Sequence, residues 1–513
     1  MELFKDIKKN KRSFYIAGII NIGAILSGFD LGGIGAIVSL PSFIAGFELN
    51  TSASKLANTS GTIVTLLNAG AIIGSFAPLL VSQHLGRRYL LMISGLFFLL
   101  GGSLQTGSTM PGLGMINAGR VIAGVGVGLI SNVSPTFMAE CAPKQYRGFM
   151  MSLYDLYLIF GGLIGYFAVY GCQIHLAPTS AQWRIPFSLQ LPLAAIIVVG
   201  AYSSYESPRW LARKDRLDEM RDTLCKLRGC TVEDPALATE IAEILAQVHE
   251  EVAATAGNTF RELFIQGNWQ RLAWGLSLAM FSTSCGHNVI LYCPSKDAPT
   301  VFKDIGYVTP SSTILGGGVI LIIKLAAVLL FLIGPVEYFG RRTLLMTGTF
   351  GMGVCIYILG ALLAVDPPSS RKSGELGNGG RAMVAMVYVF QIFYSVSWGP
   401  LLWVYLGEIF PNRIREYGMA PCVAACWAFN LLWSKVQPIA ILHTGWKTWM
   451  IFGTLNVCAT ILCYFLPETR HLSVEEMDVL FGAVDGQTRA NDIDNELHLK
   501  GAMELHETAD KTV

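Results

Sequence analysis

The chain has 513 residues, of which 52% are hydrophobic and only 14% are charged; a soluble domain is usually about a quarter charged. Lys and Arg number 37 against 36 for Asp and Glu, so the charge balance gives no indication of a nucleic-acid partner. The composition therefore predicts an integral membrane protein and argues against a soluble one.

The apolar runs along the chain predict two sets of six membrane-spanning helices, since a helix needs about 20 apolar residues to cross the hydrocarbon core. The first set is expected at residues 14–39, 59–82, 89–106, 114–138, 148–171 and 185–204. The second set is expected at 271–293, 312–336, 343–365, 382–408, 417–442 and 447–466. The predicted fold class is an all-α membrane protein with twelve transmembrane helices in two six-helix halves, 14–204 and 271–466.

A polar segment at 205–270 separates the two halves and contains the stretches RKDRLDEMRDTLCKLRG and PALATEIAEILAQVHEEV. Both have the pattern of amphipathic helices, which predicts a helical linker on the cytoplasmic side. Lys and Arg favour the short loops on the side of residues 1–13. This bias predicts that both termini, including the tail 467–513, are cytoplasmic. Asn50-Thr-Ser would then lie in an external loop as a candidate glycan site.

Three motifs occur once in each half. LGRR at 85–88 recurs as FGRR at 339–342, and ESPRWL at 206–211 recurs as PETRHL at 467–472. A third motif, Glu-x-x-Pro-x-x-x-Arg, begins at Glu140 and again at Glu408. Since the three offsets are similar, we infer a duplicated six-helix unit. Parallel repeats of this kind are typical of alternating-access carriers, which bind their substrate at the midplane between the halves.

These motifs resemble the signatures of the sugar porter family of the major facilitator superfamily, in a fungal form. GRVIAGVGVGLISNVSPTFMAECAPKQYRG (119–148) resembles the fourth-helix signature, and SWGPLLWVYLGEIFPNRIRE (397–416) the tenth-helix signature. ESPRWL and PETRHL resemble the motifs that end the two halves. The resemblance covers nearly all of residues 14–481. It implies the twelve-helix fold of that superfamily and a proton-coupled sugar permease of the plasma membrane.

The repeated acids and bases predict a cytoplasmic gate of ion pairs between neighbouring helices. The residues assigned to this gate are Arg87, Arg88, Glu140, Arg147, Glu206, Arg341, Arg342, Glu408, Arg415 and Glu468. Exposed pairs are worth only about 0–1 kcal/mol each, which suits a contact that must open. The alternative is that the basic residues only anchor the loops on the cytoplasmic side. The family usually has Asp three residues before the first Gly-Arg-Arg, where this chain has Gln83; Glu337 keeps the acid in the second half.

Asp30 lies within the first apolar run, and Arg120 lies within the fourth. An ionisable residue at bilayer depth normally faces a cavity and a partner, so we expect these two side chains to pair. The family resemblance supports this, because proton-coupled sugar porters carry an acid in the first helix and an arginine in the fourth. Asp30 and Arg120 are therefore the candidate proton-coupling residues, against the alternative of a permanent structural pair.

The substrate site implied by the resemblance departs from the family pattern. The family's seventh helix has two glutamines, then Gly-x-Asn, then two tyrosines; here FSTSCGHNVILYC (281–293) keeps only the glycine, the asparagine and the first tyrosine. Gly286 is expected to loosen that helix. The candidate substrate residues are Asp155, Ser282, Thr283, His287, Asn288, Tyr292, Lys324, Trp403, Trp427 and Asn430.

Two of these residues bear on the substrate class. Asp155 takes the place of the family's sugar-binding glutamine in the fifth helix, and Lys324 lies deep within the eighth. We expect hexose or pentose uptake on family grounds. A polyol or a sugar acid is the alternative, because Lys324 could bind a carboxylate. If Asp155 and Lys324 pair, they would bridge the two halves.

Other function classes fit less well. A nutrient sensor that signals without transport is a second alternative, but such sensors tend to have long cytoplasmic tails, and few residues follow Leu466. No nucleophile–base set or phosphate loop indicates an enzyme, and no cofactor or metal is expected. The expected partners are a small sugar, polyol or sugar acid, a proton and the lipid bilayer, and the protein is expected to be a monomer.

Overall fold

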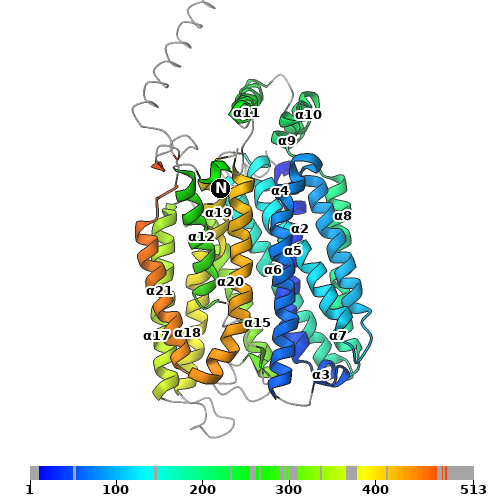
Figure 1. Cartoon of the computed structure of the whole chain (residues 1–513), viewed down its shortest axis with the longest axis vertical. Coiled ribbons are helices and arrows are strands. Elements are labelled where there is room, and N and C mark those ends of the chain that lie inside the picture. Colours follow the sequence, from blue (N-terminus) through cyan, green and yellow to red (C-terminus); the bar gives the residue numbers. More distant parts are fainter. Residues whose placement is uncertain are drawn as a thin grey trace, which may run out of the picture.

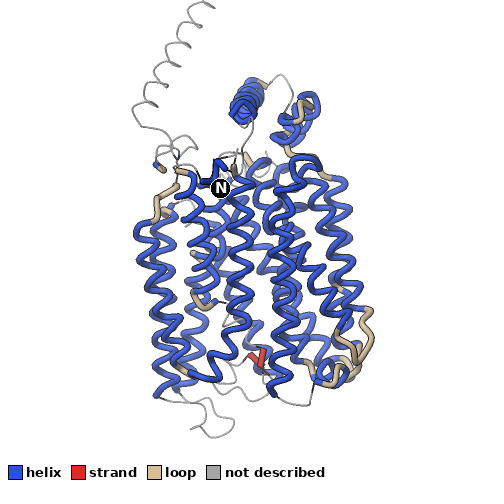
Figure 2. Tube along the Cα trace, in the orientation of Figure 1, coloured by secondary structure: helices blue, strands red, loops and turns tan. Residues whose placement is uncertain are grey.

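The fold is taken from a computed structural model of the chain, shown in Figure 1 coloured along the sequence. The structure describes residues 11–49, 53–143, 147–230, 234–254, 261–264, 267–287, 294–295, 298–299, 310–334, 338–365, 378–411, 414–470, 477 and 480–481. In this part of the chain almost all regular structure is helical, as Figure 2 shows. The all-α fold class predicted from the sequence is confirmed.

The first half is a bundle of long helices. Its elements are α2 (Lys11–Ser39), the short α3 (Pro41–Gly46), α4 (Ala53–Thr106), α5 (Gly114–Cys141), α6 (Arg147–His175), α7 (Ala181–Ser188) and α8 (Gln190–Ser203). The long α4 contains two membrane spans, since its backbone turns at Gly86, where φ is +77°. With α7 and α8 counted as one span, the six helices expected in this half are present.

The second half lies beside the first and repeats its organisation (Figure 1). Its helices are α12 (Asn268–Ser284), α15 (Pro310–Ile333), α17 (Arg341–Val365), α18 (Asn378–Ser395), α19 (Trp398–Ile409), α20 (Arg415–Thr444) and α21 (Lys447–Phe465), with two short paired strands, β1 (Pro294–Ser295) and β2 (Ala298–Pro299). Two expected helices are interrupted. The span 382–408 breaks at Ser397 (φ −134°, ψ −89°), and the span 271–293 stops being helical after Ser284, before Gly286 with φ +95°.

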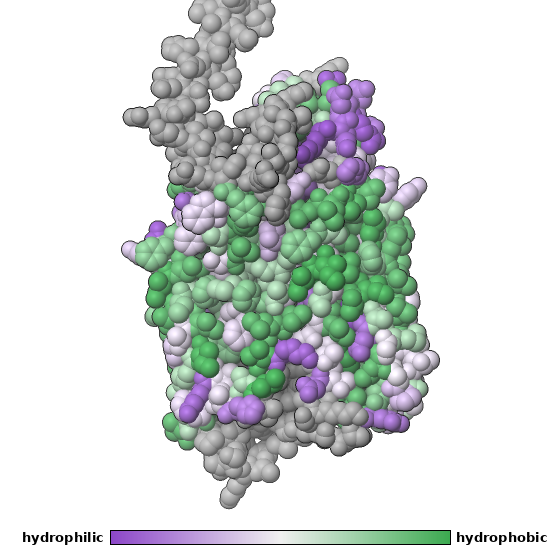
Figure 3. Space-filling model, in the orientation of Figure 1, coloured by the Kyte–Doolittle hydropathy of each residue, from purple (hydrophilic) through white to green (hydrophobic). Residues whose placement is uncertain are grey.

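The surface of the bundle is apolar around its middle. Figure 3 shows a broad hydrophobic belt on the face that is drawn. Large apolar side chains such as Leu80, Leu330 and Phe350 are exposed on the helices. Nine helical stretches among the described residues are long and apolar enough to cross a membrane. Helices satisfy their own backbone hydrogen bonds, so such a belt can face lipid without leaving polar backbone groups unpaired.

The linker forms the two amphipathic helices that its sequence predicts. These are α10 (Leu217–Arg228) and α11 (Pro235–Ala254), preceded by the short α9 (Pro208–Arg213) and followed by the 3₁₀ turn Arg261–Phe264. They lie beyond the same end of the bundle at which α2 begins (Figure 1). Arg228 fixes them there, because its guanidinium pairs with Glu240 at 2.6 Å and donates to the Cys141 carbonyl at 3.1 Å.

Candidate functional site

Asp30 and Arg120 form a fully buried ion pair in the first half. Arg120 Nη1 lies 2.7 and 2.6 Å from the two carboxylate oxygens of Asp30, and both side chains are 0% exposed. Gln190 Nε2 of α8 donates to the same carboxylate at 2.9 Å. Arg120 Nε donates to the Ile63 carbonyl at 3.1 Å, which fixes the guanidinium between α4 and α2. The pairing expected from the sequence is present, with Gln190 as a third member.

The close approach of α2 and α6 places Asp30 beside the centre of the bundle. Gly28 lies two residues before Asp30, and a Cβ atom added to it would lie 1.8 Å from the Leu158 carbonyl oxygen of α6. A Cβ atom on Gly161 would lie 2.0 Å from the Ile25 carbonyl oxygen of α2. Small residues of this kind let membrane helices pack backbone to backbone. The same contact orients α6, which carries Asp155 toward the second half.

Lys324 of α15 has a tight polar and aromatic environment. Its Nζ lies 3.3 Å from His287 Nε2 and 5.5 Å from the ring centroid of Tyr394. The His287 and Tyr394 rings stack at 3.8 Å with an interplanar angle of 8°. Lys324 is only 5% exposed, and among the described residues no carboxylate lies within 4.0 Å of its ammonium. Since an ammonium has three donors and no acceptor, it can still bind an anion.

Asp155 of α6 faces Lys324 across the boundary between the halves. The two groups are close enough to interact electrostatically, but no direct hydrogen bond or ion pair joins them in the described part of the chain. A Cβ atom on Gly399, at the start of α19, would lie 2.8 Å from Asp155 Oδ2, so the carboxylate lies against the second half. The side chain is buried, and Oδ2 has no hydrogen-bond partner.

Other buried polar groups described in this region also lack some or all of their hydrogen-bond partners. One is the indole Nε1 of Trp427 on α20, and the side-chain amide of Gln391 on α18 has only the His287 ring beside it. Buried polar groups are normally hydrogen-bonded to protein or water, so a cluster of unsatisfied donors and acceptors indicates a place for a polar ligand. Asp155 offers an acceptor from the first half, and Lys324 and Trp427 offer donors from the second.

The remaining expected substrate residues divide into four groups. Trp403 packs edge-on against Tyr154 with centroids 4.9 Å apart. Asn430 accepts a hydrogen bond from Asn68 at 3.4 Å and so joins the halves. Ser282 and Thr283 donate to carbonyls of their own helix. Asn288 and Tyr292 lie outside the described residues.

Ion pairs occupy the end of the bundle next to the linker, where the gate was expected. Arg87 Nη2 lies 2.9 Å from Glu140 Oε1, and Arg341 Nη2 lies 3.0 Å from Glu408 Oε1 in the second half. Arg87 also pairs with Glu416 at the start of α20. This last contact crosses from one half to the other, and the repeated motifs do not include Glu416.

Glu206 and Glu468 differ from their expected role as side-chain ion-pair partners. Glu206 Oε1 accepts from the backbone amide of Arg87 at 2.9 Å, and Glu468 Oε1 from that of Arg341 at 2.9 Å. Each carboxylate thereby satisfies free amides at the start of a helix, where the helix dipole also favours negative charge. A Cβ atom on Gly86 would lie 2.5 Å from Glu206 Oε2, so the glycine of Gly-Arg-Arg makes room for the acid.

The backbone amides of Arg88 and Arg342 donate to Glu206 and Glu468, whereas their side chains contact aromatic rings. Arg88 stacks on the rings of Tyr89 and Tyr202, and Arg342 lies over the ring of Tyr464 at 5.0 Å. Arg415 Nη2 donates to the Phe410 carbonyl at 3.4 Å. The side chains of Arg147 and Gln83, and all of Glu337, lie outside the described residues.

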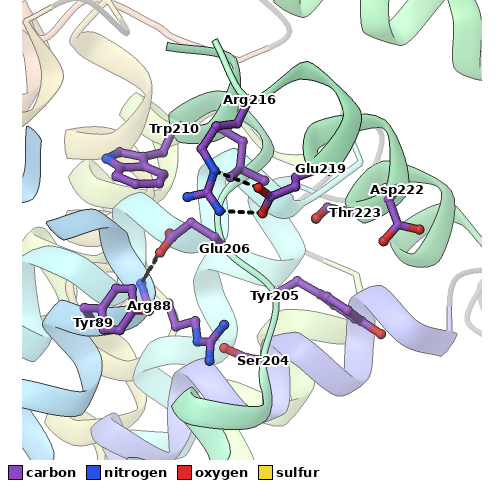
Figure 4. Close-up of a pocket in the computed structure, with 11 residues that line it drawn as sticks. Arg88, Tyr89, Ser204, Tyr205, Glu206, Trp210, Arg216, Glu219, Asp222 and Thr223 are labelled. Atoms are coloured by element: carbon purple, nitrogen blue, oxygen red, sulfur yellow. Dashed lines mark hydrogen bonds and ion pairs between the residues drawn. The ribbon is translucent and has the colours of Figure 1, made fainter. Parts of the chain in front are cut away.

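A cavity of about 180 Å³ lies beside this network, between the start of the second span of α4 and the linker helices (Figure 4). Arg216 and Glu219 form a bidentate pair in its wall, and Glu206 reaches toward the Arg88 amide. Burial raises the pKa of Glu206, and the amide hydrogen bonds from Ser207, Arg88 and Arg87 oppose that shift. The charged groups drawn in Figure 4 thus have partners within the protein.

The two halves are in contact at both ends of the seam between them. Arg87 and Glu416 close the end next to the linker. At the opposite end Lys435 Nζ of α20 donates to Thr62 Oγ1 of α4 at 2.9 Å. Contacts between the halves therefore lie on both sides of the group of side chains around Asp155 and Lys324, which is called the central chamber below.

The sequence patterns missed four residues that contribute to these sites: Gln190, Gln391, Tyr394 and Glu416. Gln190 and Gln391 are polar residues within apolar runs, so the depth argument that selected Asp30 could have found them. Tyr394 and Glu416 carry no such signal, because a tyrosine in a membrane helix and an acid at a helix start are both common.

Comparison with known proteins gives consistent matches over almost the whole chain. The profile of the family described as sugar (and other) transporter matches residues 16–481. A probable quinate permease of Aspergillus clavatus is 33% identical over 480 residues, covering 92% of this chain and 88% of the relative. A probable quinate permease of Aspergillus fumigatus is 32% identical over 480 residues, with the same coverage.

Solved structures match this chain over a similar share of its length. The proton:xylose symporter XylE bound to 6-bromo-6-deoxy-D-glucose is 27% identical, with a TM-score of 0.79 and coverage of 92% of this chain and 100% of the other. The inward-open conformation of XylE from E. coli is 26% identical, with a TM-score of 0.69 and coverage of 91% and 99%. The lower score for the inward-open form agrees with the closed seam next to the linker.

Proposed function

The chain belongs to the sugar transporter family, within the major facilitator superfamily, and from this premise we propose that it imports a polyhydroxylated carboxylate together with a proton. The fold and the family are those of multi-pass membrane transporters and not of enzymes. The substrate class, the coupling ion, the site residues and the location are parts of the proposal. The protein acts as a monomer in the plasma membrane with both termini in the cytoplasm.

The environment of Lys324 is the main observation that supports a carboxylated substrate. A buried ammonium is costly at this depth unless an anion accompanies it, and no described carboxylate lies within 4.0 Å of Lys324. A substrate carboxylate could occupy that position and form a charge-assisted hydrogen bond. The relatives described as probable quinate permeases favour the same class, since quinate is a ring that carries both hydroxyls and a carboxylate.

Asp155 and the neighbouring polar groups would bind the hydroxyls of the ring. Asp155 Oδ2 accepts from a hydroxyl, while the Trp427 indole supplies a donor. The substrate would then contact the first half through Asp155 and the second through Lys324. A carrier with a central site binds its substrate between the two halves, so one ligand should contact both.

Asp30 and Arg120 are the proposed coupling pair. Protonation of Asp30 would release Arg120, whereas the carboxylate holds it at 2.6 Å. Alternating access would move the halves 14–204 and 271–466 against each other, with 205–270 as the linker. The Arg87–Glu416 contact would break when the site opens to the cytoplasm.

The test is a panel of labelled substrates in a yeast strain that lacks its own sugar carriers. We expect quinate or another sugar acid to be accumulated, and a protonophore to abolish accumulation. Uptake of only neutral sugars would reject the carboxylated class. Signalling without uptake of any substrate would favour a nutrient sensor.

A neutral hexose, pentose or polyol is the second candidate, and the proximity of Asp155 to Lys324 favours it. If these two charges compensate each other through space, the chamber as a whole needs no anion. The same panel separates the two candidates, because Lys324→Gln should weaken a sugar acid far more than a neutral sugar if the carboxylate binds there. If Lys324→Gln weakens binding of the sugar acid and of the neutral sugar equally, the neutral substrate class is favoured.

A further inference from the structure

α4 and α20 lie side by side along the seam between the two halves (Figure 1). On the side away from the linker two polar contacts join them. Lys435 Nζ donates to Thr62 Oγ1 at 2.9 Å, and Asn68 Nδ2 donates to Asn430 Oδ1 at 3.4 Å further toward the centre. Both contacts must separate when the seam opens on this side, because each joins one half to the other.

The outer contact has an unusual composition for a gate, since it pairs a full charge with a neutral hydroxyl. Lys435 is partly buried, and no described carboxylate lies within ion-pair distance of it. Its ammonium has three donors, of which the bond to Thr62 uses one. Among the described residues the other two donors have no acceptor, so Lys435 can bind an anion once the seam parts.

The position of Lys435 on α20 connects it to the central chamber. Trp427, Asn430 and Lys435 follow one another along α20 at intervals of three and five residues, and about 12 Å of helix separates the first from the last. Asn430 faces Asn68 of the opposite half, and Trp427 carries the unpartnered indole of the chamber. A substrate that leaves Lys435 would therefore pass Asn430 before it reaches Trp427 and Lys324.

On the basis of the proposed function, we propose that Lys435 is an outer binding site for the carboxylate of a polyhydroxylated acid. Thr62 and the substrate compete for the same ammonium. When the outer seam is open, Lys435 attracts and holds the carboxylate at the mouth of the path. When the substrate moves inward, the bond to Thr62 forms again behind it and closes the seam.

The experiment compares Lys435→Gln, Lys435→Arg and the control Lys447→Gln in whole cells. Lys447 is a suitable control because it begins α21 at the same end of the bundle and is exposed. The reporter is whichever of labelled quinate, glucose, xylose or inositol the wild type accumulates fastest. Quinate is measured both as a substrate and as a competitor of that reporter, at about 10 mM and about 300 mM salt, which span weak and strong screening.

We expect Lys435→Gln to raise the KM or the inhibition constant of quinate about tenfold at low salt, the lower end of steering effects. The change should shrink at high salt, because screening weakens the attraction in the wild type. Lys435→Arg should keep most of the quinate affinity, and the KM of a neutral reporter should not change. Lys447→Gln should behave as the wild type.

The other outcomes separate this proposal from the proposed function. If quinate is transported and Lys435→Gln matches Lys447→Gln, the outer site is rejected while the transported class stands. If quinate competes through Lys435 without being transported, the outer site stands and the transported class is rejected. If quinate neither enters nor competes in the wild type, both are rejected. Equal changes for quinate and a neutral reporter, or a change independent of salt, also reject the outer site.

Discussion

The Arg87 guanidinium contacts Glu416 across the boundary between the halves, and the same Nη2 atom lies 2.9 Å from Glu140 of its own half. One arginine therefore has two acidic partners, one in its own half and one in the other half. When the halves part at this end, Arg87 keeps Glu140 and loses only Glu416. This arrangement limits the free energy needed for opening.

Glu416→Gln should favour opening next to the linker. Arg87 retains Glu140, so the loss should be about 1.5–3 kcal/mol, as for a hydrogen bond to a charged group. Accessibility of a cysteine introduced on the cytoplasmic path is the measurement, and it should rise. Glu219→Gln, which breaks the exposed pair with Arg216, is the control and should leave accessibility unchanged. No difference between the two variants would show that Glu416 does not hold this end closed.

Asp30→Asn should abolish accumulation against a gradient and retain exchange. An asparagine cannot bind and release the coupled proton, yet it can still accept a hydrogen bond from Arg120. Accumulation and counterflow of the same labelled substrate are the two measurements. Gln190→Leu removes the 2.9 Å hydrogen bond to Asp30 but keeps the carboxylate, so it should preserve accumulation. Accumulation by Asp30→Asn with a normal pH dependence would exclude Asp30 as the coupling residue.

Asp155→Asn and Lys324→Met should each impair transport, and their combination should do no worse than the poorer single variant. Each single variant leaves an uncompensated charge in the chamber, whereas the double variant leaves none. The measurement is the initial uptake rate of the wild type, the two single variants and the double variant, which together form a double-mutant cycle. Since no direct bond joins the two groups, the coupling acts through space. Losses that multiply would instead indicate that each group binds the substrate independently.

Gly86→Ala should destabilise the protein more than Gly445→Ala. Both glycines have positive φ, +77° and +55°, so both substitutions carry the backbone strain of a left-handed residue. Only at Gly86 would the new Cβ atom also approach Glu206, at 2.5 Å; nothing lies within 4 Å of it at Gly445. Thermal unfolding in detergent should show a lower Tm for Gly86→Ala. Equal shifts for the two variants would mean that strain alone matters at Gly86.

Much of the architecture could be predicted because membrane helices need long apolar runs, and these are visible in one sequence. The break at Ser397 could not, since an apolar run reads the same whether its helix is continuous or interrupted. Asp30 and Arg120 were found as a pair because charge is rare at this depth. The stacking of His287 on Tyr394 depends on how the residues after α12 approach α18, and no local pattern contains that information.

Glu206 and Glu468 also bear on how each half moves. Glu206 follows the last helix of the first half and binds the amide of Arg87, at the start of the third span. Glu468 follows the last helix of the second half and binds the amide of Arg341 in the equivalent place. Each carboxylate thus joins the segment that follows the last helix of a six-helix unit to the start of the third span of the same unit. A unit closed in this way resists internal shear, so that displacement during a transport cycle concentrates at the interface with the other unit.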